Sequence, residues 1–306
     1  MALRIGLSGG AANVDRMVDQ VVEAEADGFT SMWYAGAIGT DPLVLLPVLG
    51  RATSTIELGT SIVQTYPRHP VLMAQQASAV AMAVGGGRFT LGIGVSHRPA
   101  IEMTYGLDYD RNAEHLREYL EVLGPMLTEG KVAFEGGEYT ARAELRMRPD
   151  APVPVVVAAL ASKALRSAGS LADGTITWMA NRRAIESHVA PKINAAASEA
   201  GRPAPRVIVG LPVAVTDDVD AGRQAAAEQF AGYGMLPNYQ RILARGGISS
   251  PADAAIVGNE AAVAAELEAL AAAGATDIWA AIFPVGDDRR ASRDRTKNLL
   301  RDLVAG

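Results

Sequence analysis

The run Val153-Pro154-Val155-Val156-Val157-Ala158 is wholly apolar and predicts a short, fully buried strand. A helical segment, Lys163–Leu171, follows it, and a second strand, Thr175–Trp178, comes next. Strands buried on both faces are typical of parallel sheets, because the connecting helices cover those faces. This unit therefore predicts an α/β fold with a parallel sheet.

The same alternation runs through the whole chain of 306 residues. The other predicted strands are Leu3–Leu7, Phe29–Tyr34, Ile56–Thr60, Phe89–Ile93, Arg206–Val215 and Thr276–Phe283. The other predicted helices cover residues 15–27, 42–53, 70–84, 111–129, 183–200, 259–273 and 293–304, with an interrupted helical stretch over 218–255. A doubly wound sheet would show this alternation too, but eight units in about 300 residues favour a closed barrel.

We therefore predict a single (β/α)8 TIM barrel with short insertions, in which residues 1–306 form one domain. Residues 131–140 look like one such insertion, a small β-excursion that turns at Gly136-Gly137. In this fold the chemistry sits in the loops that follow the carboxyl ends of the strands.

The composition limits the chemistry and the partners. The net charge is −6 and the hydrophobic content is 49%, which disfavours nucleic acid or an anionic membrane as the main partner. The chain has no cysteine, so disulfides, thiolate catalysis and cysteine-ligated metals are excluded. No signal peptide and no membrane span is recognised, and we expect a cytoplasmic protein that acts on a small molecule.

Two histidine-containing loops are candidates for chemistry. His97 follows a predicted strand at its carboxyl end, where barrel enzymes place catalytic groups, and we expect it to contact cofactor or substrate. His69 precedes a helix and more simply orders its loop, whereas His115 and His188 lie within helices as packing residues. No histidine spacing indicates a metal site.

An anion site is predicted where the strand at 153–158 meets the next helix. The connection Ala159-Leu160-Ala161-Ser162-Lys163 contains small residues, which let a phosphate approach the N–H groups of a helix N-terminus. An ordinary strand–helix turn is the equally good alternative. Trp178 could contact the face of a planar heterocycle or simply pack at the barrel rim.

Several motifs resemble the luciferase-like flavin and deazaflavin oxidoreductases. The segments that carry the resemblance are 58–63 (LGTSIV), 66–75 (YPRHPVLMAQ), 87–94 (GRFTLGIG), 154–159 (PVVVAA) and 168–174 (AGSLADG). They occur in the family's order and spacing across nearly the whole chain. The resemblance is especially close to a compact actinobacterial subgroup that uses the deazaflavin coenzyme F420.

The resemblance implies positions for the cofactor. The family holds its ring against a bulge that matches Ser61-Ile62, which implies a cis peptide bond there, and Gly94 ends the matching strand four. The phosphate site matches Ala159–Lys163, and Trp178 is expected to contact the cofactor. His97 stands where relatives often carry a glutamate. The family also implies a homodimer.

One departure from the family bears on the reaction. Alcohol and sugar-phosphate dehydrogenases of this family carry Asp-His after strand two, and the aligned residues here are Gly36-Ala37. This favours reduction of an activated C=C or C=N bond by an F420-dependent reductase, with His97 or Tyr66 as proton donor. An FMN-dependent monooxygenase and a non-catalytic flavin-binding barrel remain alternatives. The Ala- and Gly-rich rim argues against a highly charged sugar phosphate as substrate.

Overall fold

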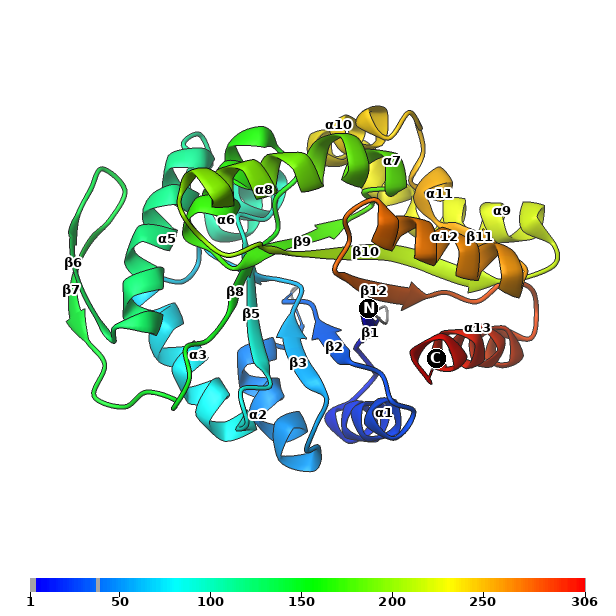
Figure 1. Cartoon of the computed structure of the whole chain (residues 1–306), viewed down its shortest axis with the longest axis horizontal. Helices are drawn as coiled ribbons and strands as arrows, with labels where there is room; N and C mark the ends of the chain where they lie inside the picture. Colours follow the sequence, from blue (N-terminus) through cyan, green and yellow to red (C-terminus); the bar gives the residue numbers. More distant parts are fainter. Residues whose placement is uncertain (1–3, 37–38, 306) are drawn as a thin grey trace.

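A computed structural model describes residues 4–36 and 39–305, and it is a closed parallel barrel (Figure 1). The barrel strands are β1 (Arg4–Ser8), β2 (Ser31–Tyr34), β3 (Glu57–Thr60), β5 (Phe89–Gly94), β8 (Val155–Val157), β9 (Gly174–Trp178), β10 (Arg206–Val215) and β12 (Asp277–Ile282). Each pairs in parallel with its neighbours, and the pairing of β9 with β10 closes the ring. The predicted (β/α)8 barrel is confirmed.

Helices cover the outside of the barrel. They are α1 (Val14–Ala26), α2 (Pro42–Ala52), α3 (Pro70–Val84), α4 (Arg98–Tyr105), α5 (Asn112–Thr128), α6 (Ser162–Leu171), α7 (Arg182–Ala184), α8 (Ala190–Glu199), α9 (Val219–Phe230), α10 (Pro237–Arg245), α11 (Pro251–Ala254), α12 (Glu260–Ala272) and α13 (Arg289–Ala305). A π-helical turn, η1 (Ile185–Val189), joins α7 to α8, and a 3-10 turn, η2 (Ala231–Met235), joins α9 to α10. Short strands β4 (Val63–Gln64) and β11 (Ile256–Gly258) extend the sheet.

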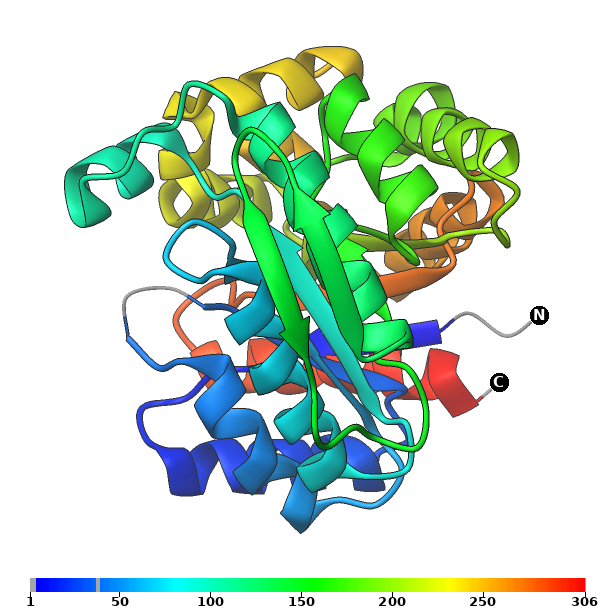
Figure 2. The ribbon, with the colours of Figure 1, turned by 90° about the vertical axis from the view of Figure 1, so that its left-hand side faces the viewer.

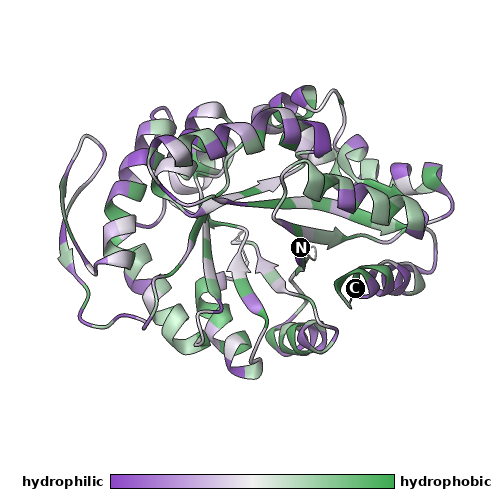
Figure 3. Ribbon diagram, viewed as in Figure 1, coloured by the Kyte–Doolittle hydropathy of each residue, from purple (hydrophilic) through white to green (hydrophobic). Residues whose placement is uncertain are grey.

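Sequence patterns explain where the main helices begin. Asn13 and Asn259 accept hydrogen bonds from the first turns of α1 and α12, and Pro42 and Pro70 occupy first-turn positions, where a missing N–H is harmless. Hydrophilic residues gather on the outer helices, while β10 is largely hydrophobic (Figure 3). Within the described residues, no helix is long and apolar enough to cross a membrane.

The insertion after α5 is a complete hairpin. Strands β6 (Lys131–Glu135) and β7 (Thr140–Glu144) pair in antiparallel register and lie outside the barrel against α5 (Figure 2). The Glu118 carboxylate of α5 accepts hydrogen bonds from the backbone N–H groups of Gly137, Glu138 and Tyr139. The hairpin therefore continues four residues beyond the predicted excursion, and a buried carboxylate fixes its turn.

Two large side chains fill the barrel interior. Trp33 and Trp279 pack there with Val156, Ile176 and Ile208. A Cβ atom on Gly59 would lie 2.2 Å from the Trp33 ring, and one on Gly210 would lie 2.1 Å from the Trp279 ring. The glycines in these apolar strands thus make room for indole rings.

The bottom of the barrel is closed by ion pairs. Arg206, at the start of β10, contacts Glu57 and Asp277 at 2.7 Å each, and Arg4 contacts the same two carboxylates at 2.7 and 2.8 Å. The side chain of Asp277 is only 2% exposed. Hydrogen bonds to Arg206 and Arg4 keep the pKa of Asp277 below its ordinary value even though burial acts to raise it. The four charges balance one another at the closed end.

Candidate functional site

A cavity of about 1400 Å³ opens at the carboxyl ends of the strands. It is lined by the loops that follow β1, β3, β5, β8 and β9, by the end of β12, and by the segment that joins α9 to α10. Seven of the predicted site residues line it: Ser61, Ile62, His97, Leu160, Ala161, Ser162 and Trp178. A space of this volume can hold a large cofactor together with a small substrate.

The other predicted residues lie beside the cavity. Ala159 is fully buried under the loop, Gly94 ends β5 behind Ile62, and Lys163 is an exposed residue of the first turn of α6. Tyr66 stacks on the His115 ring, with a centroid distance of 3.8 Å. None of these four residues lines the cavity. Ala159 and Gly94 support residues that do line it.

The bulge after β3 has the shape that the resemblance implies. The Ser61–Ile62 peptide bond is cis, as expected. Ser61 N–H donates to the Tyr34 carbonyl at 2.8 Å, and Gly36 N–H donates to the Ile62 carbonyl at 3.0 Å. A Cβ atom on Gly94 would lie 3.1 Å from Ile62 Cδ1, so a glycine lets the bulge pack closely against β5. The Ser61 hydroxyl is buried and has no hydrogen-bond partner among the described residues.

The loop after β8 leads into α6 without a capping side chain. Ala161 is the N-cap residue and cannot accept a hydrogen bond through its methyl group. The first N–H groups of α6 are therefore free of a side-chain cap and lie next to the cavity. His188 of η1 holds the loop, with its Nε2 2.8 Å from the Leu160 carbonyl. The mid-helix histidine that sequence predicted as packing thus supports the candidate anion site.

His97 is positioned by the residue before it. Ser96 has a φ of 61°, a left-handed conformation that is uncommon for a serine. The Tyr109 hydroxyl donates to the Ser96 carbonyl at 2.8 Å, and Gln64 Nε2 donates to the Ser96 hydroxyl at 3.1 Å. Burial lowers the pKa of His97, so its imidazole is mainly neutral at pH 7. It can then donate one hydrogen bond and accept another.

Tyr66 belongs to an aromatic cluster beside the cavity. His115 lies 2.8 Å from the Thr65 hydroxyl and 3.1 Å from the Tyr139 hydroxyl. Burial lowers the pKa of His115 to about 4 and raises the pKa of Tyr66. His69 caps α3 by accepting from Val71 N–H at 3.3 Å, which is the loop-ordering role expected for it. The cluster is packed and hydrogen-bonded, and it connects the β6–β7 hairpin, α5 and the bulge after β3.

The segment that covers one side of the cavity was not among the predicted site residues. Phe230, Tyr233, Tyr239, Arg241 and Arg245, from the end of α9 to the end of α10, all line the cavity. The helical pattern over 218–255 was recognised, but no motif marked its interruption at 234–237 as part of a site. The available signal in the sequence was the spacing of the aromatic residues Phe230, Tyr233 and Tyr239 around a helix start. The same spacing is also typical of ordinary core packing.

Two indole N–H groups complete the cavity wall. Trp178 and Trp279 are 5.2 Å apart between ring centroids, and both line the cavity. Neither Nε1 atom has an acceptor among the described residues. A buried donor without an acceptor is costly, and an indole N–H can only donate. With the Ser61 hydroxyl, these donors suit a ligand that carries carbonyl oxygens.

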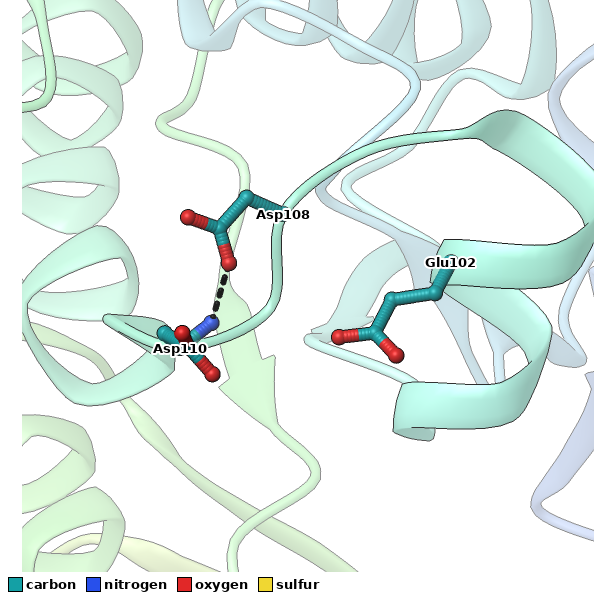
Figure 4. Close-up of side chains that lie close together, drawn as sticks. All are labelled: Glu102, Asp108 and Asp110. Atoms are coloured by element: carbon teal, nitrogen blue, oxygen red, sulfur yellow. Dashed lines mark hydrogen bonds between the residues drawn. The ribbon is translucent and has the colours of Figure 1, made fainter.

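Three exposed carboxylates gather at the rim. Glu102 of α4 lies near Asp108 and Asp110 of the following loop, and their oxygens are within 4.8 Å of one another (Figure 4). Asp110 N–H donates to Asp108 at 2.8 Å, and Arg98 pairs with both Glu102 and Asp110. The guanidinium offsets one of the three negative charges and links α4 to the loop that follows it.

Known proteins resemble the whole chain. A family model described as luciferase-like monooxygenase matches residues 2–304. An uncharacterized protein of Mycobacterium tuberculosis is 29% identical over 80% of this chain and 76% of its own length. An F420-dependent glucose-6-phosphate dehydrogenase of Beutenbergia cavernae is 29% identical over 87% of this chain and 78% of its own. The fold is shared with a coenzyme F420-dependent tetrahydromethanopterin reductase of Methanopyrus kandleri, at a TM-score of 0.81 and 21% identity over 97% and 98% of the two chains.

Proposed function

The chain belongs to the luciferase-like monooxygenase family, and from this premise we propose that it is an oxidoreductase that uses coenzyme F420 to reduce an activated C=C or C=N bond of a small organic substrate. The observation that carries the proposal is the single cavity in which a bulge, unpartnered N–H and O–H donors and an uncapped helix start face the same space. The names of the relatives in Beutenbergia and Methanopyrus support F420 as the cofactor.

The residues present fit a deazaflavin. Its ring system carries carbonyl oxygens, which match the unpartnered Ser61, Trp178 and Trp279 donors. Its phosphate matches the N–H groups at the start of α6, beyond Ala161. Arg241 and Arg245 line the same cavity one helical turn apart on α10 and suit its anionic tail.

The protein's own contribution is binding, orientation and proton supply. When bound in its reduced form, the deazaflavin supplies a hydride, and the substrate then needs one proton to complete the reduced bond. His97 lies in the cavity and can hold that proton at an imidazole nitrogen. Tyr66 is a weaker candidate, because it is outside the lining and burial raises the pKa of its hydroxyl.

Alcohol oxidation fits less well. Gly36 lines the cavity without a side chain, and a Cβ atom there would lie 2.9 Å from the Ile62 carbonyl. A base at position 36 would therefore displace the bulge. Ala37, the second residue of the predicted departure, lies outside the described residues. The site offers a proton donor but no base at position 36, which supports reduction.

The homodimer expected from the family has a suitable surface. Val44 and Val48 of α2 are 70% and 49% exposed, and Leu72 and Met82 of α3 are 44% and 38% exposed. The two helices pack side by side, so these exposed apolar side chains lie on neighbouring elements. Val44→Asp should shift sedimentation from dimer to monomer. A wild-type monomer at micromolar concentration would contradict a dimer on this surface.

A cofactor titration tests the proposed function. Two of the three tryptophans, Trp178 and Trp279, line the cavity, so their fluorescence should fall when a ring system binds. We expect saturable quenching by F420 at micromolar concentration and much weaker quenching by FMN. Trp178→Phe should remove part of the signal. Preferential binding of FMN would favour the monooxygenase alternative, and no binding of either would favour a non-catalytic barrel.

A further inference from the structure

An aromatic wall runs along one side of the cavity. Ring centroids are 5.4 Å apart between His97 and Tyr239, 5.1 Å between Tyr239 and Tyr233, 5.7 Å between Tyr233 and Trp178, and 6.1 Å between Trp178 and Phe230. All five residues line the cavity. The series starts at the candidate proton donor and ends at Phe230, which packs against the buried Phe283, so a ligand beside His97 meets this wall.

Most of the wall comes from one segment. Phe230 ends α9, Tyr233 lies in η2 and Tyr239 lies in the first turn of α10. Leu236 and Pro237, between them, also line the cavity. The wall therefore offers ring surfaces and aliphatic carbon without a formal charge. Phe230 and Tyr239 are 7% and 9% exposed, so packing holds them in place.

Several cations also line the cavity. Arg98, next to His97, pairs with Glu102 and Asp110. Burial lowers the pKa of His188, and the charge of Arg245 lowers it further, which places Arg245 near the histidine that holds the Leu160 carbonyl. Arg241 donates to Asn238 at 2.6 Å. No ion pair among the described residues includes Arg241 or Arg245. Arg245 therefore lies on the α6 side of the cavity, where an anionic cofactor is expected, whereas the charge of Arg241 acts on Tyr109 near His97.

We propose that the wall formed by Phe230, Tyr233 and Tyr239 is the substrate subsite, and that the substrate is a neutral, planar, conjugated ring compound rather than a sugar phosphate. This inference rests on the proposed function for its reaction. A ring stacked on such a wall gains stabilisation beyond the burial of its area, whereas a phosphorylated sugar would lose hydration against three uncharged rings.

The reaction balances in electrons and protons. One carbon of the conjugated C=C bond accepts a hydride from the reduced deazaflavin, the other carbon takes a proton through His97, and the π bond is lost. The cofactor loses two electrons and the substrate gains them. Conjugation with a carbonyl group makes the accepting carbon electrophilic, so planarity and reactivity come from the same chemical feature.

Calorimetric titration of the full-length protein with coumarin tests the subsite. Coumarin is neutral and planar and has a C=C bond conjugated to a carbonyl. Octahydrocoumarin has the same skeleton without planarity, and glucose 6-phosphate represents the charged class. We expect coumarin to bind at least tenfold more tightly than the other two, both with and without F420.

Matched variants locate the binding. Tyr233→Ala and Phe230→Ala should each weaken coumarin binding roughly 3- to 30-fold, and Tyr233→Phe should restore it because the ring is retained. Met235→Ala is the control, since Met235 is 78% exposed, belongs to the same segment and is outside the lining. The affinity for F420, measured from its own absorbance, should stay unchanged in all of them.

Each contrary result has a distinct meaning. Tighter binding of glucose 6-phosphate would overturn the substrate class. A loss of F420 affinity in Tyr233→Ala, with coumarin binding intact, would assign the wall to the cofactor and overturn the subsite. If wild-type protein fails to bind F420, the proposed function fails, while coumarin titration of the protein alone still confirms or overturns the aromatic subsite.

Discussion

The polar groups at the two ends of the barrel differ in whether they have hydrogen-bond or ion-pair partners. At the bottom, Arg206 and Arg4 meet Glu57 and Asp277 in four ion pairs of 2.7–2.8 Å. At the mouth, the Ser61 hydroxyl and two indole N–H groups are buried and find no partner in the part of the chain that the structure describes. Burying polar groups is expensive, so a chain that pairs them at one end could in principle pair them at the other.

We infer that the paired charges at the bottom stabilise the fold and that the unpartnered donors at the mouth bind ligand. Residues at the amino-terminal face of a TIM barrel hold the strands together, and those at the carboxyl-terminal face do chemistry. The unpartnered donors at the mouth are the groups that a ligand would satisfy. Changes at the bottom should therefore alter the free energy of unfolding and spare ligand binding, and changes at the mouth should do the reverse.

The largest effect is expected at His97. If it supplies the proton, His97→Ala should lower turnover about 10²- to 10⁴-fold, the usual range for general acid catalysis, with little change in F420 affinity. The protonated fraction of His97 grows as the pH falls, and because burial lowers its pKa this growth lies at lower pH than for a free histidine. Wild-type turnover should therefore rise towards acidic pH, and the variant should lose that rise. Steady-state kinetics between pH 5 and 8 measures both.

His69→Ala is the matched control for this variant, because His69 caps α3 outside the cavity lining. Its turnover should stay close to that of the wild type. A drop in cofactor affinity with normal saturated turnover would make His97 an anchor for the ring. If both quantities stay normal in His97→Ala, the next residue to test is Tyr66.

Arg206→Met tests the opposite end. The substitution leaves Arg4 as the one cation that pairs with Glu57 and Asp277 among the described residues, and breaking a buried ion pair on one side typically costs about 3–5 kcal/mol. Denaturant unfolding should show this loss, and F420 affinity at low temperature should stay unchanged. Arg290→Met removes an exposed pair with Asp294 and should cost less than about 1 kcal/mol. Equal losses in the two variants would contradict the assignment of stability to the bottom network.

The sequence predicted the barrel because the fold depends on repeated local patterns. Apolar runs such as Val153–Ala158 and proline or asparagine at helix starts are readable residue by residue. Helix α4 lies between the strand predicted at 89–93 and the helix predicted at 111–129, where no helix was expected, and its eight residues bury only Ile101. The bulge at Ser61-Ile62 was predicted through family resemblance, and no local pattern of these residues indicates a cis bond.

The site was predicted only in part, because cavities form between segments that are distant in sequence. Tyr239 lies 142 positions after His97, yet their rings are neighbours across the mouth. The role of His188 beneath the Leu160 carbonyl likewise depends on how η1 packs against the loop after β8. Strand-end loops could be named from sequence, but which side chains meet there depends on tertiary packing.

His115 is an exception to the difference between the mouth and the bottom of the barrel. It lies near the mouth, yet its ring is buried and contacts the Thr65 and Tyr139 hydroxyls, like the satisfied groups at the bottom. Its pKa is about 4 in the folded chain against about 6.5 when unfolded, so the unfolded chain binds more protons between these pH values. The stability present above pH 6.5 should therefore be lost as the pH falls through 4, by up to about 3 kcal/mol.

His115→Phe isolates this contribution. The variant keeps an aromatic ring against Tyr66 but cannot titrate, so the free energy of unfolding should depend less on pH between 6.5 and 4 than in the wild type. Urea unfolding at several pH values gives the difference between the two curves, in which carboxylate contributions cancel. Parallel curves would mean that His115 is protonated in the folded protein and that its surroundings are less dry than the structure indicates.

The smallest expected effect concerns the start of α6, whose first N–H groups have no side-chain cap. Ala161→Glu places a carboxylate at the uncapped helix N-terminus, where the dipole attracts it, and it should compete with the cofactor phosphate and weaken F420 binding about 3- to 30-fold. Ala161→Gln has nearly the same size without the charge and should weaken binding less. The difference between the two variants should shrink at high salt, because screening weakens interactions between exposed charges. Equal affinities for Glu and Gln at low salt would show that the phosphate binds elsewhere, and Arg241 and Arg245 would then be the groups to substitute.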